Sequence, residues 1–430
     1  MFCARRFSLL RPVLGLVTYF GLVAANMAQA EGYGVFEPEA MAMGGAAVAI
    51  ASPGNAVFYN PARLAQYRYD EDRGRHGRLY FPSFSAQSSQ SVEDLYNIDE
   101  DQIVDELTAA VDQYNAQQDA ASAGQVVDAS REVLQTLTNI QGETLYGNTY
   151  AGLVVAEPGD GQGGAFFIAG RGFGDGDLTG IADADLALMQ DYIDGLDFIA
   201  SAGQRGEEHP ELFGPDGLID PRNQIVSTAS AAAAAGIELG VAMAQSFNIR
   251  DQNIAFGITP KLMLLKTFDA ELNISQNSID TTQSEKWTRR LNADIGVAAN
   301  IGNFNMGLAV KDVFRHNIET TQGQAIIIEP KPRLGLGYIG QRFKVGVDYD
   351  MAAIKPVATG MESQDVSVGV EWRALRQIAL RFGYKEDLQG NHGTALSAGV
   401  GVSLGRFLMD LSYVESDDEL AAALQFGLKI

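Results

Sequence analysis

The second half of the chain alternates apolar residues with small or polar residues over a series of short segments. Residues 343–349 read FKVGVDY and residues 366–372 read VSVGVEW. The same two-residue period recurs over 378–384, 396–404, 407–413 and 424–430. Because successive side chains of a strand point to opposite faces, each segment predicts a strand with one apolar face. Transmembrane barrels require this pattern, although a soluble β-sandwich would show it as well.

The lengths of the connections separate these two architectures. Tight turns are predicted near Asp160, Asp251, Gly302, Gly340, Leu375 and Gly405. Longer connections fall between them, at residues 91–141, 174–233, 270–286, 317–332, 351–365, 385–393 and 415–419. Outer-membrane barrels combine short turns at one end with long loops at the other. The alternation of short and long connections therefore predicts an all-β fold. This fold is a transmembrane antiparallel β-barrel of about 14 strands over residues 79–430, with extracellular insertions at 91–141 and 174–233.

The two faces of the predicted strands carry different residues. Aromatic residues, which favour membrane–water interfaces, lie near the ends of the apolar faces, at Tyr338, Tyr349, Trp372, Tyr384 and Tyr413. The opposite faces carry small residues at Gly369, Gly399 and Gly401, which predicts free space in the lumen. Lipid of the outer membrane is thus the predicted partner of the apolar face.

Both large insertions contain apolar residues at helical spacing. In the first, this spacing predicts two amphipathic helices, separated by a break at Gly124, that pack on each other or on the barrel rim. In the second, Leu186, Met189 and Ile193 predict a short helix. Residues 175–180 read DGDLTG, like the opening of a calcium loop, but Leu186 stands where such a loop needs a bidentate Glu. We therefore expect a solvated loop there.

The first thirty residues have the features of a cleaved secretory signal peptide. Arg5, Arg6 and Arg11 precede or flank an apolar core, and Ala28-Gln29-Ala30 fits a cleavage site. Cys3, the only cysteine, lies within residues 1–30. The mature chain is then expected to lack thiols and disulfides, and to be exported to the outer membrane of a Gram-negative bacterium.

Charge and the missing motifs exclude several functions. The chain carries a net charge of −23, which argues against nucleic acid because nucleic-acid binding requires a basic face. The four histidines, His76, His209, His316 and His392, show no metal-ligand spacing, and no G-x-S-x-G or H-E-x-x-H motif is present. We therefore predict no enzyme activity, no metal and no cofactor.

A stretch of small apolar residues and turns, residues 41–65, precedes the first predicted strand. It reads MAMGGAAVAIASPGNAVFYNPARLA. Gly44 and Gly45 allow close backbone approach or a positive φ. The aromatic pair Phe58-Tyr59 is followed by Asn60 and Pro61, and proline is favourable at a first helical position.

This stretch resembles the N-terminal signature of FadL-type outer-membrane transporters of hydrophobic compounds. Together with the helical insertion and the segment GLVVAEPGDGQGGAFFIAGRG, it makes the chain similar to the plasmid-transfer TraF outer-membrane family, as distinct from the thioredoxin-like proteins of that name. The resemblance implies a hatch, or plug, over residues 31–78, inside the barrel. It also implies hatch or gating residues at Gly44, Gly45, Asn55, Phe58, Tyr59, Asn60 and Pro61.

Two functions fit these observations. One is passage of a hydrophobic or amphipathic compound through a plugged barrel, with exit by a lateral gap near the hatch. The alternative is a surface anchor associated with conjugation, in which the acidic helical insertions contact an unknown protein partner. The size of the insertions favours the second function, and the hatch signature favours the first.

Overall fold

The structure is a computed structural model of the whole chain. It describes residues 34, 36–67, 77–91, 100–177, 180–202, 209–214, 217–219, 226–249, 252–273, 278–283, 287–323, 325–354, 362–416 and 418–430. The predicted signal peptide, residues 1–30, lies outside the described residues, as does part of the predicted hatch.

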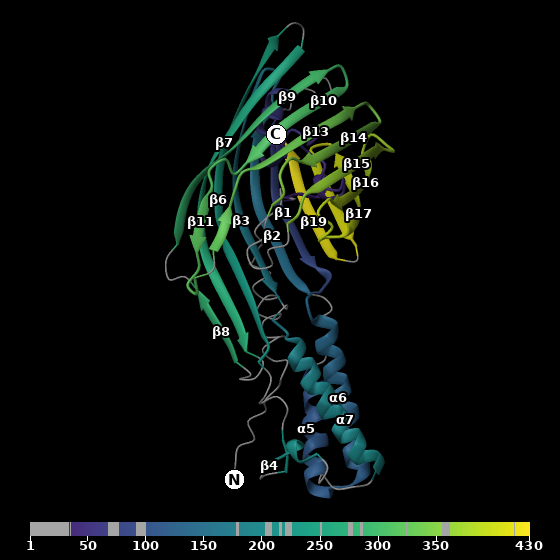
Figure 1. Ribbon diagram of the computed structural model, residues 1–430. Helices are drawn as coiled ribbons and strands as arrows, with labels where there is room; N and C mark the ends of the chain where they lie inside the picture. Colours follow the sequence, from purple (N-terminus) through teal and green to yellow (C-terminus); the bar gives the residue numbers. More distant parts are fainter. Residues whose placement is uncertain are drawn as a thin grey trace.

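Antiparallel strands form one closed barrel (Figure 1). In ring order from β6, the strands are β6, β3, β2, β1, β19, β18, β17, β16, β15, β14, β13, β10, β9 and β7, and pairing of β6 with β7 closes the ring. The predicted 14-strand barrel is thereby confirmed. A fifteenth strand, β8 (Ser278–Gln283), pairs with the C-terminal end of β7.

The barrel strands have unequal lengths. Their bounds are β1 Arg78–Ser89, β2 Thr144–Glu157, β3 Gln162–Asp177, β6 Thr228–Ile249, β7 Gln252–Asn273, β9 Thr288–Ile301, β10 Phe304–Lys311, β13 Lys331–Ile339, β14 Phe343–Asp350, β15 Asp365–Arg373, β16 Ile378–Asp387, β17 Thr394–Leu404, β18 Phe407–Glu415 and β19 Glu419–Lys429. The longest, β6 and β7, have 22 residues each. Their far ends extend the wall beyond the shorter strands beside them (Figure 1).

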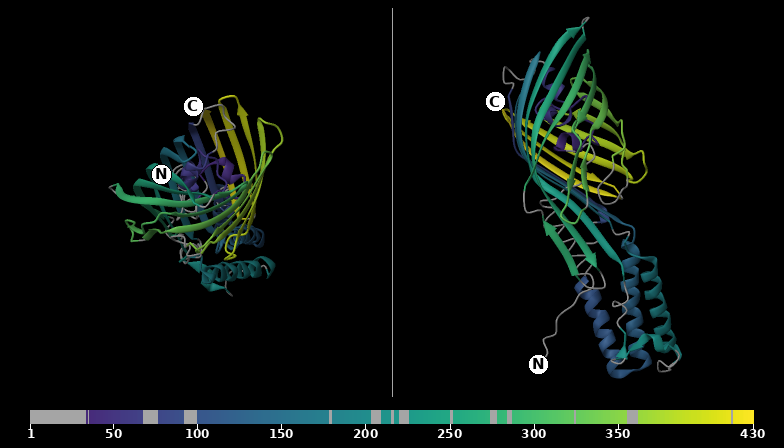
Figure 2. Two further views of the ribbon diagram at one scale, coloured as in Figure 1. Left: turned by 90° about the horizontal axis from the view of Figure 1, so that it is seen from above. Right: turned by 60° about the vertical axis from the view of Figure 1, so that its left-hand side comes forward.

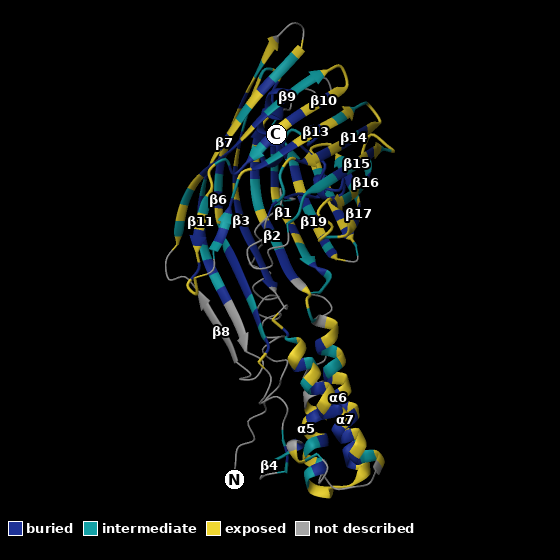
Figure 3. Cartoon of the chain, viewed as in Figure 1, coloured by how far each residue is buried: buried dark blue, intermediate teal, exposed yellow. Residues whose placement is uncertain are grey.

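The two faces of the wall follow the sequence alternation (Figure 3). In β16, Phe382 is 60% exposed on the outer face while its neighbour Arg381 is 6% exposed. The five predicted girdle aromatics are all at least 37% exposed and so point outward. An apolar outer face with polar residues inside is the arrangement that lipid requires of a barrel.

Short and long connections alternate around the barrel, as predicted, except that the connection expected to be long between β18 and β19 has three residues, 416–418. One end, the short-turn end, carries the six predicted tight turns together with Arg78 and Lys429. The other end, the long-connection end, carries the helices and two small hairpins, β4–β5 (Phe213–Gly214 with Gly217–Leu218) and β11–β12 (His316–Glu319 with Ala325–Ile328). The short 3-10 helix η3 (Pro210–Leu212) precedes β4.

Three long helices extend away from the long-connection end (Figures 1 and 2). They are α5 (Glu100–Gln117), α6 (Ala120–Ile140) and α7 (Asp183–Ala202). Their apolar faces form a common core that includes Val126, Met189 and Leu196. Among the helices described, none is long and apolar enough to cross a membrane.

Two predictions about the insertions are wrong. Gly124 lies inside α6, because Asp119 caps that helix: its side chain accepts from the Ser122 amide, and Ser122 Oγ accepts from the Asp119 amide. The break is therefore at Gln118 and Asp119. The expected loop at residues 175–180 begins as strand, since Asp175 pairs with Ala232 in the ladder between β3 and β6. The helix predicted near Met189 is longer than expected, with 20 residues.

Candidate functional site

Residues 36–66 lie inside the barrel, where they form short helices and turns (Figure 2). The helices are α2 (Pro38–Met41), α3 (Ala56–Tyr59) and the 3-10 helix η1 (Pro61–Ala65). Nearly every residue of this lumenal segment is buried, and Met43, Ile50 and Leu64 are at most 2% exposed. At the short-turn end, the Gly159 amide donates to Leu64 O at 2.8 Å, so the segment is attached to the β2–β3 turn.

Gly44 and Gly45 form the turn closest to the long-connection end. Their φ values are +67° and +91°, in the region that favours glycine. A Cβ on Gly44 would lie 2.6 Å from the backbone oxygen of Tyr384 in the wall. No larger residue fits there without displacing the segment or β16.

The prediction that inward glycines leave free lumen space is wrong. A Cβ on Gly369 would lie 2.4 Å from Met43 Cβ, and one on Gly399 would lie 2.5 Å from Ala42 Cβ. Gly401 faces the side chains of Asp410 and Arg381 instead. The space that these glycines provide is occupied by the lumenal segment and by inward charges.

Asn60 and Pro61 shape the second half of the segment. Asn60 Oδ1 accepts from the Ala62 amide at 3.1 Å, and Pro61 stands at the first position of η1. Asn60 Nδ2 also donates to Val48 O at 3.1 Å and to Val297 O of β9 at 3.0 Å. One side chain thus caps a helix, joins the halves of the segment and binds the wall.

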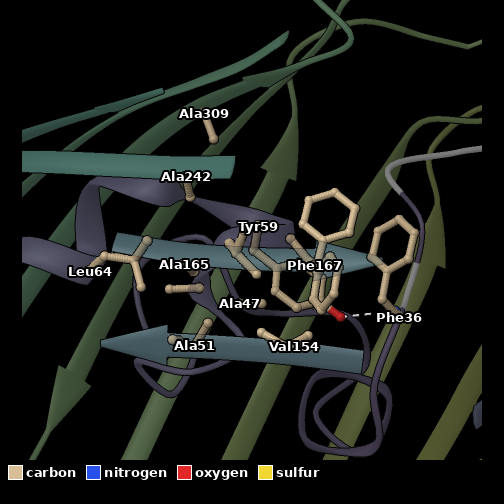
Figure 4. Packing of buried hydrophobic residues seen from close by; sticks show 14 of the residues in the cluster. Phe36, Ala47, Ala51, Tyr59, Leu64, Val154, Ala165, Phe167, Ala242 and Ala309 are labelled. Atoms are coloured by element: carbon tan, nitrogen blue, oxygen red, sulfur yellow. Dashed lines mark hydrogen bonds between the residues drawn. The ribbon is translucent and has the colours of Figure 1, made fainter. Parts of the chain in front are cut away.

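Aromatic residues pack the middle of the lumen (Figure 4). The Phe58 ring lies 5.3 Å from that of Phe36, 5.4 Å from Tyr150 and 5.2 Å from Phe167, between centroids. Tyr59 Oη accepts from the Phe36 amide at 3.0 Å. Such aromatic pairs stabilise the fold by more than the burial of their apolar area alone would.

Asn55, the last of the predicted hatch residues, binds the wall near β1. Its Nδ2 donates to Gln425 Oε1 at 3.2 Å, and Gln425 Nε2 donates to Ser83 Oγ at 3.0 Å. All seven predicted residues therefore belong to one segment that contacts the wall. What the sequence analysis missed is the charged groups of the wall that bind this segment.

Asp348 of β14 is one of these charged groups. Its Oδ2 accepts from the amides of Ala47 and Val48, both at 2.8 Å. Lys344 of the same strand is ion-paired with Glu39 of α2. Because Lys344 and Asp348 are four residues apart on one strand, both point inward, and the alternating pattern already placed them on the polar face.

The ion pair at Glu39 continues across the wall. Lys344 Nζ lies 3.4 Å from Glu371 Oε2, Arg381 Nε lies 2.8 Å from the same oxygen, and Arg381 Nη1 lies 2.6 Å from Asp410 Oδ1. These side chains are mostly buried, so each charge depends on its neighbours for compensation. Removing one of them leaves an unpaired buried charge beside the segment.

A second charged cluster lies along four neighbouring strands of the wall, β3, β6, β7 and β9. Lys261 Nζ lies 2.8 Å from Asp294, 2.7 Å from Asp312 and 3.3 Å from Glu238. Glu238 also pairs with Arg171 at 2.9 Å. Lys311, beside this cluster, places its Nζ 3.7 Å from the centre of the Phe36 ring, a cation–π contact with the segment.

Burial perturbs the ionisable residues of the segment itself. Burial and the neighbouring Glu39 raise the pKa of Glu37 to about 8. Burial also raises the pKa of Glu39, but Lys344 and Arg381 outweigh it and hold that pKa below its usual value. Burial lowers the pKa of Arg63 to about 10. Glu37 is therefore mainly neutral at pH 7, and Glu39 is ionised.

Two adjoining cavities lie between the Gly44–Gly45 turn and the long-connection end. The larger, of about 70 Å³, has polar walls that include Tyr146, Arg333, Asp365, Lys385, His392 and Glu419. The smaller, of about 20 Å³, is lined by Met41, Ala395, Val414 and Ala421. Both share Gly44, Gly45 and Lys385, so together they form one site with a polar and an apolar part. Within the described residues, no group of three or more His, Cys, Asp or Glu side chains is placed to hold a metal ion.

A model of the family described as "F plasmid transfer operon, TraF, protein" matches residues 57–350. The match covers well over half of the chain, from α3 in the lumenal segment to the end of β14. The chain belongs to this TraF family. No curated protein sequence matches it.

Solved structures similar to this TraF-family chain include proteins titled as hydrocarbon channels and transporters. The P. putida toluene transporter TodX has a TM-score of 0.47 and 10% identity, over 93% of this chain and 99% of TodX. A TodX deltaS2S3 mutant, titled a monoaromatic hydrocarbon channel, has a TM-score of 0.48 and 10% identity, over 92% and 99%. CymD, also titled a monoaromatic hydrocarbon channel, has a TM-score of 0.32 and 8% identity, over 92% and 97%.

Proposed function

We propose that this TraF-family barrel lies in the outer membrane and passes an amphipathic or hydrophobic compound, with the lumenal segment acting as its plug. The long-connection end faces outward, as the loop asymmetry of outer-membrane barrels favours. The compound enters there and reaches the two-part cavity above Gly44 and Gly45. The cavity is the observation that carries this proposal, because its polar and apolar walls suit a molecule with both kinds of surface.

An irregularity in β1 supports a lateral exit. Phe81 and Pro82 interrupt the register of β1 with both of its neighbours, β19 and β2, which is a bulge in an otherwise regular wall. Phe81 is 63% exposed on the outer face. Bulges locally disrupt the hydrogen-bonded ladder. On the inner side, the segment is bound beside the bulge through Asn55, Gln425 and Ser83. Movement of the segment there would open a route from the lumen into the membrane.

Uptake and conductance, measured side by side, test this function. Proteoliposomes carrying the intact chain, a variant that lacks residues 41–65, or no protein receive a labelled hexyl-chain compound. The same samples are tested for ion conductance in planar bilayers. We expect the intact chain to pass the compound without steady ion conductance, and the variant to conduct ions because its lumen is unplugged. Identical uptake and conductance for both chains would refute a plug.

A second function is favoured by the helices outside the barrel. We propose as the alternative that α5, α6 and α7 bind a protein partner at the cell surface during conjugal transfer, with the barrel as their anchor. The helices share a hydrophobic core and contain 12 acidic residues and one arginine. The description of the family as a plasmid-transfer protein is in keeping with such a role.

Replacing α5, α6 and α7 by short linkers separates the two functions. The measurements are conjugation frequency of the cells and uptake of the hexyl-chain compound. A loss of conjugation with unchanged uptake would support the anchor function. Unchanged conjugation would contradict it, provided that the shortened protein reaches the outer membrane in normal amounts.

A further inference from the structure

We infer that the two-part cavity selects amphiphiles without net negative charge and excludes carboxylates and sulfates. This inference rests on the proposed function, because it specifies the compound that the cavity admits.

Both cations of the cavity are already paired with carboxylates. Arg333 donates from Nε and Nη2 to the two oxygens of Asp350, at 2.5 and 2.7 Å, with both side chains 4% exposed. Lys385 is ion-paired with Glu419. A bidentate, buried arginine–carboxylate pair has little capacity left for a second anion. An anionic head group would have to displace Asp350 or Glu419 and leave that carboxylate buried without its partner.

A third carboxylate makes the cavity net negative. Asp365 also lines it and interacts electrostatically with Lys385. Asp365 and Glu419 line the cavity beside Arg333 and Lys385, and Asp350, which binds Arg333 without lining the cavity, brings the count to three acidic groups against two basic ones. His392, the histidine on the wall, packs edge-on against Tyr146, with 5.4 Å between ring centroids. The local charge therefore favours a cationic, zwitterionic or uncharged head group over an anionic one.

The apolar part of the cavity sets the other requirement. Met41, Ala395 and Val414 belong to one buried cluster, and the two alanine side chains at Ala395 and Ala421 leave room beside Met41. The cavity at this point measures about 20 Å³. That space admits the first carbons of an alkyl chain while the head group remains beside Lys385 and Asp365. A compound with an apolar tail is therefore preferred over a fully polar solute.

The helices outside the barrel add a long-range effect with the same sign. The 12 acidic residues and one arginine of α5, α6 and α7 stand on the end through which a compound would arrive. A surface of one sign lowers the local concentration of ions with that sign, and the effect weakens as salt is added. Anions are thus disfavoured both on approach and in the cavity.

Binding of four hexyl compounds to the full chain tests this selection. The chain is held in nanodiscs of uncharged lipid, and calorimetry measures binding of hexyltrimethylammonium, hexyl phosphocholine, hexyl glucoside and hexanoate. We expect hexanoate to bind at least tenfold more weakly than hexyltrimethylammonium. In Glu419→Gln, which frees Lys385, hexanoate should bind at least tenfold more tightly than to the wild type. Glu386→Gln is the control, since Glu386 is an exposed acid on the outer face of β16, the strand that carries Lys385.

The outcomes separate this inference from the function on which it rests. Tightest binding of hexanoate to the wild type would overturn the charge selection and leave passage of an amphiphile intact. Binding of none of the four compounds, together with no uptake, would overturn both. If Glu419→Gln fails to fold, Asp365→Asn replaces it, because that variant removes one negative charge without unpairing Lys385. Unchanged hexanoate binding in that variant would contradict the inference.

Discussion

At the scale of single residues, the lumenal segment is held by charged groups of the wall rather than by apolar packing alone. Asp348 binds two consecutive backbone amides, and Lys344 binds Glu39. Hydrogen bonds to a charged acceptor are worth about 1.5–3 kcal/mol each, more than those between neutral groups. A few inward carboxylates and amines can therefore decide whether the segment stays docked.

Replacing the Asp348 side chain should loosen the segment locally. In Asp348→Ala the amides of Ala47 and Val48 lose their acceptor while buried, which costs about 1–3 kcal/mol per group. We expect faster hydrogen exchange at residues 47 and 48, measured by mass spectrometry of the protein in detergent.

The control for this variant is Asp387→Ala. Asp387 also accepts backbone amides, from Gln364, Asn391 and His392, but these belong to connections at the barrel end. Exchange in the lumenal segment should be unchanged in this control. Equal protection of residues 47 and 48 in Asp348→Ala and in the wild type would show that Asp348 does not hold the segment.

Docking of the segment should weaken as the pH rises from about 5 to 8. The pKa of Glu37 is raised from 4.5 to about 8 in the folded protein, so the docked carboxyl keeps a proton that the released one gives up. Docking therefore takes up a proton in this pH range, and raising the pH opposes it. The measurement is hydrogen exchange at residues 36–42, corrected for the intrinsic rate at each pH.

Glu37→Gln tests the origin of this pH dependence. The amide is neutral at every pH, and its oxygen can still accept from the Glu39 or Ala40 amide, as Glu37 does now. Protection of residues 36–42 should become nearly independent of pH in this variant. The same slope in both proteins would assign the pH effect to another group.

Sequence reasoning located the segment residues but not their partners. Gly44, Gly45, Asn60 and Pro61 are recognisable because glycine, asparagine and proline have distinct backbone preferences. In the sequence, Asp348 is marked only by its polar position in an alternation of polar and apolar residues. Many other acids in this chain occupy such positions. Which inward charge meets which amide depends on register between strands far apart in sequence, and a single sequence does not contain that information.

At the scale of elements, the strands were predictable because the period of two is strong over 8–11 residues in the second half of the chain. The helices were predictable in kind but not in their bounds. Glycine suggested a break at Gly124, yet α6 continues through it, and a capping box starts the helix at Asp119. A single glycine in a helix costs about 1 kcal/mol, which the N-cap hydrogen bonds at Asp119 can offset.

The cap of α6 gives a prediction for the bundle. Asp119→Ala should lower the stability of the three helices by about 0.5–2 kcal/mol, the usual cost of losing an N-cap side chain. The measurement is loss of helical circular dichroism in urea, with the barrel as an internal reference. Asp128→Ala removes only an exposed contact with Arg131, 3.5 Å long, and should change stability by less than about 0.5 kcal/mol. Equal effects of the two variants would contradict the capping account.

At the scale of the whole molecule, the wall of the barrel and the lumenal segment inside it pack together. The inner face of the wall has glycines where the lumenal segment lies closest to it. It has charged residues where it binds that segment. The sequence predicted a barrel, its strand number and its loop asymmetry. It did not predict that the space at Gly369 and Gly399 is filled, because Met43 and Ala42, which fill it, lie more than 300 residues away along the chain.

A disulfide between the segment and the wall tests the central claim most directly. A Cβ on Gly337 of β13 would lie 3.6 Å from Ile50 Cβ, within the roughly 3.5–4.5 Å that a disulfide spans. In the double variant Ile50→Cys/Gly337→Cys, the Ile50 methyl that would obstruct the new side chain is also removed. The single variants, treated with the same oxidant, are the controls, and Cys3 lies in the predicted signal peptide.

The measurement is uptake of the hexyl-chain compound by proteoliposomes that carry this double variant, first oxidised and then reduced. If the lumenal segment is the plug of the barrel and has to move, oxidation will abolish uptake and reduction will restore it, while both single variants remain active. Failure of the two cysteines to form a bond, or full uptake by the oxidised protein, would contradict the account.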